Sequence, residues 1–171
     1  ADHLPLDKDT ARHLDRAAWL AKADLVSQMV NEFPKLQGIM GRIYARASGE
    51  ADICARAIEE HYRPVYSGGR LPDSLAGSVL SISEKIDTIC GCFLIGLVPS
   101  GASDPYALRR QGIGLLQIIL ANGFSLAVED LIRMSLSAFS EIKPHNSVEE
   151  AADQVAAFLM NRLAHILEFE G

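Results

Sequence analysis

The sequence predicts an all-α protein, a bundle of about seven helices. Three observations lead to this class. Apolar residues recur at helical spacing along almost the whole chain, proline and glycine interrupt that pattern at intervals, and no useful length of sequence alternates apolar and polar residues as a half-buried strand does. A length of 171 residues, 49% of them hydrophobic, suits one domain with its own core, or one domain and the start of another.

The first two predicted helices are separated by Pro34, because proline ends a helix. One apolar stripe at helical spacing extends from Lys8 to Glu32. Its members are Ala11, Leu14, Ala18, Ala21, Leu25 and Met29. The next stripe consists of Leu36, Ile39, Met40, Ile43 and Tyr44. Because glycine destabilises a helix interior, Gly38 and Gly41 within this stretch indicate that another backbone approaches closely there.

Two further helices are expected on either side of the proline- and glycine-rich loop at residues 63–73. The first runs from Ala51 to Tyr62. The second has the most regular apolar stripe of the chain, with steps of four and three residues. That stripe consists of Leu75, Val79, Ile82, Ile86, Ile89 and Phe93. Either Asp73 or Ser74 is expected to cap the N-terminus of this helix.

The remaining helices are predicted from the signals at their ends. Asp104 is expected to cap a helix over residues 105–120, which begins with a proline and is closed by the sequence ANG. Ser147 and Glu150 form a capping-box pair at the start of the final helix. The last two predicted helices cover residues 126–142 and 148–168.

Charge and cysteine content narrow the function classes. The net charge of −6 argues against a sequence-blind nucleic-acid binder, so any contact with RNA must be local. Three cysteines give an odd count that favours a reducing compartment. Cys90 and Cys92 would lie about 200° apart around a helix, so they cannot hold one metal together, and Cys54 and both of these are interpreted as small buried hydrophobes. No signal peptide or membrane-length apolar run is found, and a cytoplasmic location is expected.

Two adjacent arginines stand out within an apolar helix. Arg109 falls on the apolar arc of the helix over residues 105–120, and Arg110 lies at the edge of that arc. A buried guanidinium needs a carboxylate partner, and we expect Arg109 to pair with Asp24 or Asp87. Alternatively, Arg110 is exposed near the helix start, where backbone N–H groups also favour an anion such as a phosphate.

Three long stretches resemble a known family. They are KADLVSQMVNEFPKLQGIMGRIYA (residues 22–45), AIEEHYRP (57–64) and GLVPSGASDPYALRRQGIGLLQIIL (96–120). In this order they resemble the β subunit of bacterial heterotetrameric glycyl-tRNA synthetase. The resemblance implies an internal piece of a longer chain, which fits the absence of an initiator methionine. It also implies an HD-like helical domain over residues 1–145, and over 146–171 a helix leading toward the anticodon-binding domain.

The function follows from the resemblance as an expectation. In the family, the α subunit binds glycine, ATP and magnesium, whereas the β subunit supplies tRNA recognition during ATP-dependent glycylation. We therefore expect this part of the ligase to support tRNA(Gly) binding and subunit architecture, with no cofactor and no chemistry of its own. Its expected partners are the α subunit, the rest of the β chain and tRNA(Gly), but neither DNA nor a membrane.

The resemblance also maps a degenerate HD metal site onto this sequence. HD phosphohydrolases use histidines and aspartates to hold a metal that activates water. The matching positions here are Ala23, Asp24, His61, Glu84 and Asp87. Alanine cannot bind a metal, and glutamate lengthens the ligand at position 84, so we expect no metal. When protonated, His61 is then expected to interact favourably with the dipole at the C-terminal end of its helix. Glu59 and Glu60 are expected to lie on a solvated face.

Several arginines are candidates for tRNA phosphate contacts, without base-specific readout. They are Arg42, Arg46, Arg63, Arg70 and Arg110. One alternative is an active metal-dependent phosphohydrolase that uses Asp24, His61, Glu84 and Asp87. Another is a purely structural linker between the anticodon module and the α subunit.

Overall fold

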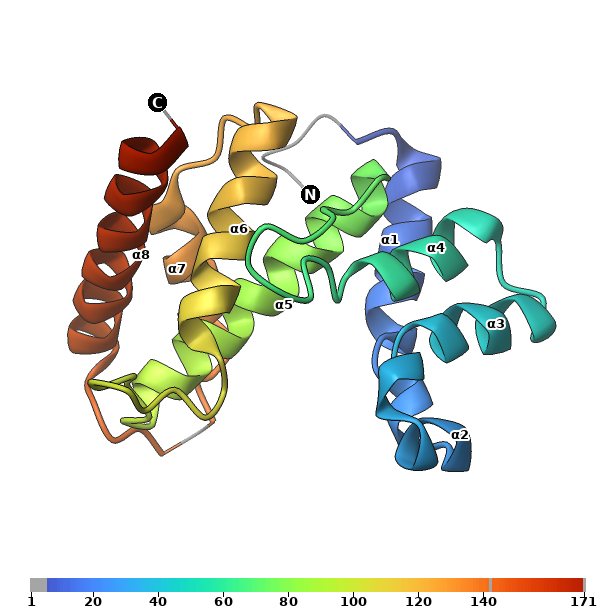
Figure 1. Ribbon diagram of the computed structural model, residues 1–171, viewed down its shortest axis with the longest axis horizontal. Coiled ribbons are helices and arrows are strands. Elements are labelled where there is room, and N and C mark those ends of the chain that lie inside the picture. Colours follow the sequence, from blue (N-terminus) through green and yellow to red (C-terminus); the bar gives the residue numbers. More distant parts are fainter. Residues whose placement is uncertain (1–5, 142, 171) are drawn as a thin grey trace. The chain divides into compact units, whose positions relative to one another are not determined.

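The computed structural model describes residues 6–141 and 143–170, and the described part is helical apart from turns, loops and one isolated bridge between Ser100 and Ser103 (Figure 1). The predicted all-α class is confirmed. None of the described helices is both long and apolar enough to cross a membrane. The α-helices of the described residues are α1 (Lys8–Leu20), α2 (Gln28–Glu32), α3 (Ile39–Ala47), α4 (Asp52–Glu60), α5 (Leu75–Leu94), α6 (Leu108–Asn122), α7 (Val128–Ser137) and α8 (Val148–Glu170). Two short 3-10 helices, η1 (Ala23–Val26) and η2 (Pro34–Leu36), complete them.

The chain divides into two compact units, residues 1–82 and 83–171, and the long helix α5 contributes to both. The boundary expected between residues 145 and 146 separates the HD-like domain from a helix that leads toward the anticodon-binding domain. It stays a prediction.

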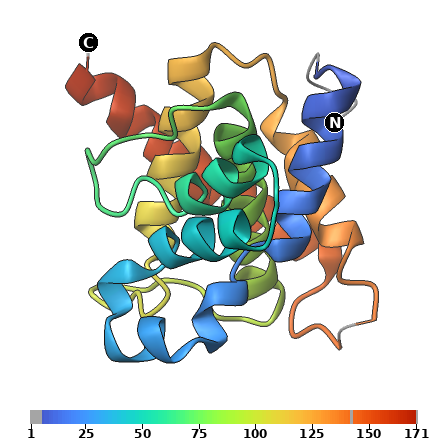
Figure 2. The same cartoon turned by 90° about the vertical axis from the view of Figure 1, so that its right-hand side faces the viewer.

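The first unit has its core around α4. This helix packs against α1 and α3, and Figure 2 shows α3 and α4 side by side with α1 along one edge of them. Most of the core residues are alanine or cysteine, which lets the helices approach closely. They are Leu14, Ala17, Ala45, Cys54, Ala55, Ala57, Ile58, Ala76 and Leu80.

The predicted single helix from Lys8 to Glu32 is wrong. The helix α1 ends at Leu20, and Lys22 adopts a left-handed conformation with φ of 66° before η1 begins. A second α-helix, α2, then starts after Ser27, whose hydroxyl accepts a hydrogen bond from the N–H of Val30. The apolar stripe continues across this break, so periodicity alone does not reveal it. A tertiary contact of Asp24, described below, explains why the chain turns here.

The close approach of another backbone is confirmed at Gly38, whereas side chains approach Gly41. A Cβ at Gly38 would lie 2.6 Å from the ring of Tyr62 and 3.3 Å from the carbonyl oxygen of Glu59, and a Cβ at Gly41 would lie 2.8 Å from Ile58. The helix therefore packs its smallest face against α4. Its isoleucines are exposed in contrast.

The predicted starts of the later helices are partly confirmed. Ser74 rather than Asp73 caps α5, since its hydroxyl accepts a hydrogen bond from the N–H of Gly77. The helix expected from residue 105 begins only at Leu108, because Ala107 takes a left-handed conformation with φ of 54°. Asp104 still caps it, reaching forward to accept hydrogen bonds from the N–H groups of Leu108 (2.7 Å) and Arg109 (3.0 Å).

The second unit consists of α6, α7, α8 and the later part of α5. The helix α8 packs against both α6 and α7. Gly112 allows this approach, since a Cβ there would lie 3.1 Å from the ring of Phe158. That ring also meets the edge of Phe93, with 5.1 Å between centroids.

The ends of these helices confirm two predictions and correct one. Gly123 closes α6 in a left-handed conformation, as the sequence ANG predicts. The capping box of α8 is formed, with the N–H of Ser147 donating to Glu150 and the N–H of Glu150 donating to the hydroxyl of Ser147. Cys54 and Cys90 are buried as expected, whereas Cys92, which was also expected to be buried, is only half-buried. Burial raises the pKa of Cys90 to about 11. The helix α7 is shorter than the predicted 126–142, whose last residue lies outside the described residues.

Candidate functional site

The positions of the degenerate HD site are divided between the two units. Ala23 and Asp24 lie on η1, and His61 is the residue that ends α4. Glu84 and Asp87 lie on α5, within the second unit. Over residues 6–141 and 143–170, no three His, Cys, Asp or Glu side chains are grouped as a metal ion would require.

Asp24 is a buried carboxylate, only 2% exposed, and it binds backbone amides. Its Oδ2 atom accepts hydrogen bonds from the N–H groups of Gly38, at 2.7 Å, and Gly41, at 3.2 Å. Gly38 is the residue that caps the N-terminus of α3, where N–H groups lack partners within the helix. A carboxylate at this position also interacts favourably with the helix dipole. Asp24 therefore holds the start of α3 against η1.

A pocket of about 290 Å³ adjoins Asp24 in the first unit. It lies between α1, η1, α3 and α4, and its polar lining includes Arg16 and Glu50. These two side chains form a salt bridge of 2.6 Å, and the hydrogen bond from Arg16 lowers the pKa of Glu50. The lining residues are Arg16, Leu20, Ala23, Asp24, Gly41, Tyr44, Ala45, Ser48, Glu50 and Ile58.

His61 lies in the core, not at a solvated helix end. It is fully buried, its Nδ1 atom is 2.6 Å from the carbonyl oxygen of Ile58, and its ring stacks on that of Tyr62 with 4.0 Å between centroids. The ring thus fills space in the core where α4 ends.

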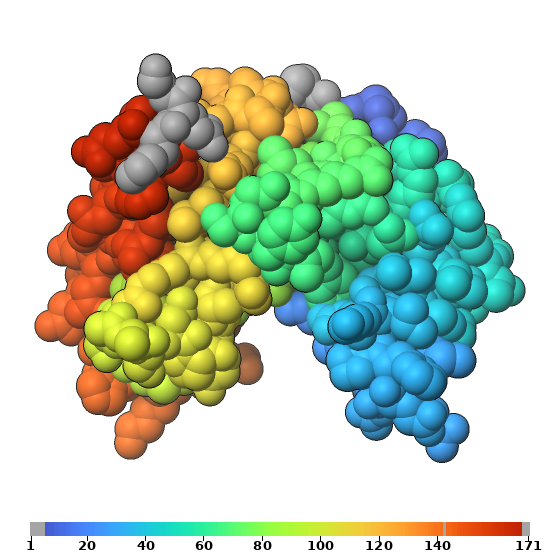
Figure 3. All heavy atoms as spheres, viewed as in Figure 1, coloured from blue at the N-terminus to red at the C-terminus, as the bar shows by residue number. Residues whose placement is uncertain are grey.

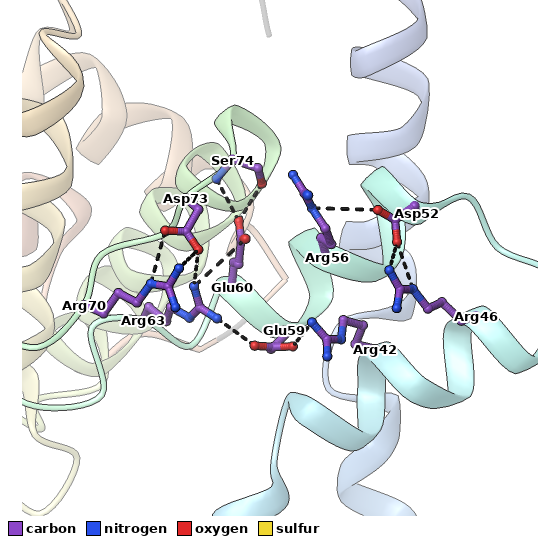
Figure 4. A network of polar contacts seen from close by, with 10 residues as sticks. All are labelled: Arg42, Arg46, Asp52, Arg56, Glu59, Glu60, Arg63, Arg70, Asp73 and Ser74. Atoms are coloured by element: carbon purple, nitrogen blue, oxygen red, sulfur yellow. Dashed lines mark hydrogen bonds and ion pairs between the residues drawn. The ribbon is translucent and has the colours of Figure 1, made fainter.

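A network of arginines and carboxylates covers α4 and its neighbours, as Figure 4 shows. Glu59 binds Arg42 at 2.9 Å and Arg63 at 2.6 Å. Arg63 also binds Asp73 at 2.9 Å, and Asp73 in turn binds Arg70 at 2.7 Å. The acidic residues of α4 thus link the start of α3 to the loop before α5.

The same figure shows two further contacts. Arg46 pairs with Asp52 at the start of α4. Glu60 is buried and accepts hydrogen bonds from the N–H (2.9 Å) and hydroxyl (2.5 Å) of Ser74. The expectation that Glu59 and Glu60 lie on a solvated face is therefore wrong, because both are drawn into contacts with other elements.

The network shifts the acidity of its carboxylates. The hydrogen bond from Arg46 lowers the pKa of Asp52 below its ordinary value of 3.8. Burial by itself raises the pKa of Asp73, but the hydrogen bonds from Arg70 and Arg63 outweigh it, and the net pKa is lowered. Both groups are therefore ionised at neutral pH and neutralise the arginines beside them.

Four of the five arginines predicted to contact tRNA phosphates take part in this network. Each has a carboxylate within ion-pair distance, so its charge is already balanced within the chain. They are Arg42, Arg46, Arg63 and Arg70. The remaining candidate, Arg110, is exposed on α6, and no carboxylate among the described side chains forms an ion pair with it. The phosphate contacts stay a prediction, which the structure favours most at Arg110.

Arg109 is half-buried on α6, and sequence reasoning missed its neighbour Arg162 on α8. Burial lowers the pKa of Arg162, and so does the positive charge of Arg109. The guanidinium of Arg162 lies 3.6 Å from the centre of the Phe158 ring and donates a hydrogen bond to the carbonyl oxygen of Phe158. The pairing of Arg109 with Asp24 or Asp87 stays a prediction. Arg162 follows Phe158 by four residues in the sequence. That spacing places both side chains on the same face of a helix, and it is the signal from which their contact could have been predicted.

The fold and this site define an all-helical protein in which the arginines of the first unit are paired with carboxylates. Comparison with known proteins then identifies the family. The family model described as glycyl-tRNA synthetase beta subunit matches residues 1–171. The chain belongs to the glycyl-tRNA synthetase β subunit family.

Curated relatives agree with this family. A glycine–tRNA ligase beta subunit of Desulforapulum autotrophicum is 52% identical over 96% of this chain. One of Desulfatibacillum aliphaticivorans is 45% identical over 96%, and one of Desulforamulus reducens is 42% identical over the full chain. The chain covers 24%, 23% and 25% of these three relatives, so it spans about a quarter of their length. Their names agree with the ligase expectation and not with a phosphohydrolase.

Proposed function

We propose that this chain is part of a glycine–tRNA ligase β subunit and supports tRNA(Gly) binding and subunit architecture during ATP-dependent glycylation. The observation that carries this proposal is the family match along residues 1–171, together with relatives that bear the ligase name. The α subunit and the rest of the β chain are its partners. ATP and magnesium act at the α subunit, the HD-like domain supplies no catalytic group, and the complex works in the cytoplasm.

The surface proposed to meet tRNA is the part of α6 that carries Arg110. Arg110 is exposed there, and Arg109 and Arg162 add positive charge nearby. A phosphate gains most from a guanidinium that no carboxylate neutralises, because an existing ion pair must be broken before the arginine can bind another anion. In a chain of net charge −6, such a local surface is what a phosphate contact requires.

The test compares two exposed arginines in the full-length β subunit assembled with its α subunit. Arg110→Ala is expected to raise the KM for tRNA(Gly) roughly 3- to 10-fold and to weaken its salt dependence, as the loss of one phosphate contact does. Arg70→Ala is the matched control, since Arg70 is exposed but paired with Asp73. Activation of glycine by ATP, measured by pyrophosphate exchange, should be unchanged in both variants. Equal effects of the two variants on the KM for tRNA would contradict the proposed surface.

A further inference from the structure

The helix α3 is turned so that its large apolar side chains face outward. The face that packs on α4 and η1 consists of its small residues, with Gly41 and Ala45 buried. Ile39, Ile43 and Tyr44, which sequence periodicity assigns to the core, are exposed instead. A helix that buries glycine and alanine while leaving its isoleucines partly exposed presents a second apolar face.

The neighbouring elements extend this face. Val26 on η1 is 90% exposed and Trp19 at the end of α1 is 82% exposed. Leu25, Met29 and Phe33, on η1, α2 and the residue after α2, are exposed as well. The element η1 contacts both α2 and α3, and α2 contacts η2. Trp19 lies on the last turn of α1, which leads directly into η1, so these side chains belong to neighbouring elements of the first unit. Figure 3 shows this segment, coloured in blue tones, on the face turned to the viewer.

We name this surface the α2–α3 apolar surface. It consists of Trp19, Leu25, Val26, Met29, Phe33, Ile39 and Ile43. Single exposed apolar residues are ordinary, but a gathering of large ones marks an interaction site. Tryptophan, phenylalanine and methionine are also residue types that are enriched in the buried centres of protein interfaces.

We propose that the α2–α3 apolar surface docks against another part of the same β polypeptide. This chain spans about a quarter of the length of its relatives, so most of that polypeptide lies outside the present sequence. A covalently tethered domain is present at a high effective concentration and is therefore the favoured occupant of an apolar surface. The surface is formed of carbon-rich side chains, which suit another apolar surface and not a phosphate backbone. The inference rests on family membership and is independent of the proposed tRNA contacts.

Side-chain footprinting of the full-length β subunit, without tRNA, tests the proposal. Hydroxyl radicals label exposed Trp, Met, Phe and Tyr side chains, so Trp19, Met29 and Phe33 report on the surface directly. We expect these three to be labelled at least several-fold more slowly than the exposed Tyr66, in the β subunit alone. Labelling as fast as that of Tyr66 in the β subunit would overturn the proposal. Fast labelling that becomes slow only when the α subunit is added would also overturn it, and would assign the surface to the α subunit.

A pair of matched variants supplies a second measurement. Val26→Asp places a charge on the α2–α3 apolar surface at a side chain that makes few contacts within this chain, so the local fold should persist. In the full-length β subunit it is expected to raise the labelling of Trp19 and Phe33 several-fold. Val65→Asp is the control, because Val65 is 63% exposed but lies in the loop before α5. An unchanged footprint in Val26→Asp, or the same change in Val65→Asp, would overturn the proposal.

Discussion

At the scale of single residues, Asp24 shows how a residue that the family resemblance assigns to a metal site takes a structural role here. With alanine at position 23, the carboxylate of Asp24 accepts hydrogen bonds from two backbone amides of the next helical segment. Such charge-assisted bonds stabilise a buried carboxylate, which would otherwise be costly away from water. Asp24 thus stabilises the turn between α1 and α3 and the start of α3.

Replacing Asp24 should therefore destabilise the fold. Asp24→Ala leaves the N–H groups of Gly38 and Gly41 buried without an acceptor, and it should lower the free energy of unfolding by about 2–4 kcal/mol. Urea denaturation followed by circular dichroism measures this. Asp24→Asn keeps an oxygen acceptor and should lose clearly less. If the asparagine variant is as unstable as the alanine variant, the two hydrogen bonds are not what Asp24 contributes.

At the scale of elements, several helices begin where a side chain supplies hydrogen-bond acceptors. Asp104 does this for α6 from four residues before its start, Ser74 does it for α5, and Ser147 for α8. The sequence signals at these three positions are correct because capping is a local interaction that needs only a short side chain near the N-terminus. The start of α6 was nevertheless placed three residues too early, since the left-handed conformation at Ala107 separates the cap from the helix.

The cap of α6 gives a prediction at this scale. Asp104→Ala removes the acceptor for the N–H groups of Leu108 and Arg109 and should destabilise the protein by about 1–2 kcal/mol. Asp104→Asn, whose side chain can also cap, should cost less. Thermal and urea unfolding of the two variants beside the wild type measure the difference. Equal stability of the alanine variant and the wild type would show that these hydrogen bonds contribute nothing.

At the scale of the whole molecule, the two units differ in how their charges are arranged. In the first unit, the pKa values of Glu50, Asp52 and Asp73 are lowered by hydrogen bonds from arginines. In the second, Arg162 lies beside another arginine, and its pKa is lowered by burial and by that like charge. The first unit is therefore held partly by ion pairs of its arginines, whereas in the second unit two arginines, Arg109 and Arg162, lie close enough to repel each other.

Acid should remove the contribution of the first unit's ion pairs. A carboxylate with a lowered pKa stabilises the folded state at pH values above its ordinary pKa, and this stabilisation is lost as the pH falls through the lowered pKa. The ordinary pKa is 4.5 for Glu50 and 3.8 for Asp52 and Asp73. A triple variant that combines Glu50→Gln, Asp52→Asn and Asp73→Asn should be less stable than the wild type at pH 7. The difference should shrink as the pH falls below 3.8. Urea midpoints at several pH values measure it.

The control for this experiment neutralises three exposed carboxylates that form no ion pair among the described side chains. They are Asp15, Glu32 and Glu149. Their replacement by the corresponding amides should leave a stability difference that does not shrink in acid. A wild-type advantage over the first variant that stays constant down to the most acidic condition would contradict the role assigned to the ion pairs.

Local sequence signals were sufficient for the helical class, most helix ends and the family. Periodicity, capping residues and the spacing of glycine and proline are properties of neighbouring residues, and the stretches at 22–45, 57–64 and 96–120 identify the family by themselves. The break after Leu20 was not predictable in this way, because the apolar stripe runs through it unchanged. What turns the chain is a contact between Asp24 and residues 14 and 17 positions further on.

Which face of each helix is buried, and which charges are neutralised, depended on packing between helices. Periodicity shows that α3 is amphipathic, but only the fit of Gly41 against Ile58 turns its isoleucines outward. Composition counts the arginines, but only the folded chain pairs Arg63 with Glu59 and Asp73 while Arg110 stays exposed on α6. Helix formation is governed by near neighbours in the chain, whereas burial and ion pairing join residues that folding alone brings together.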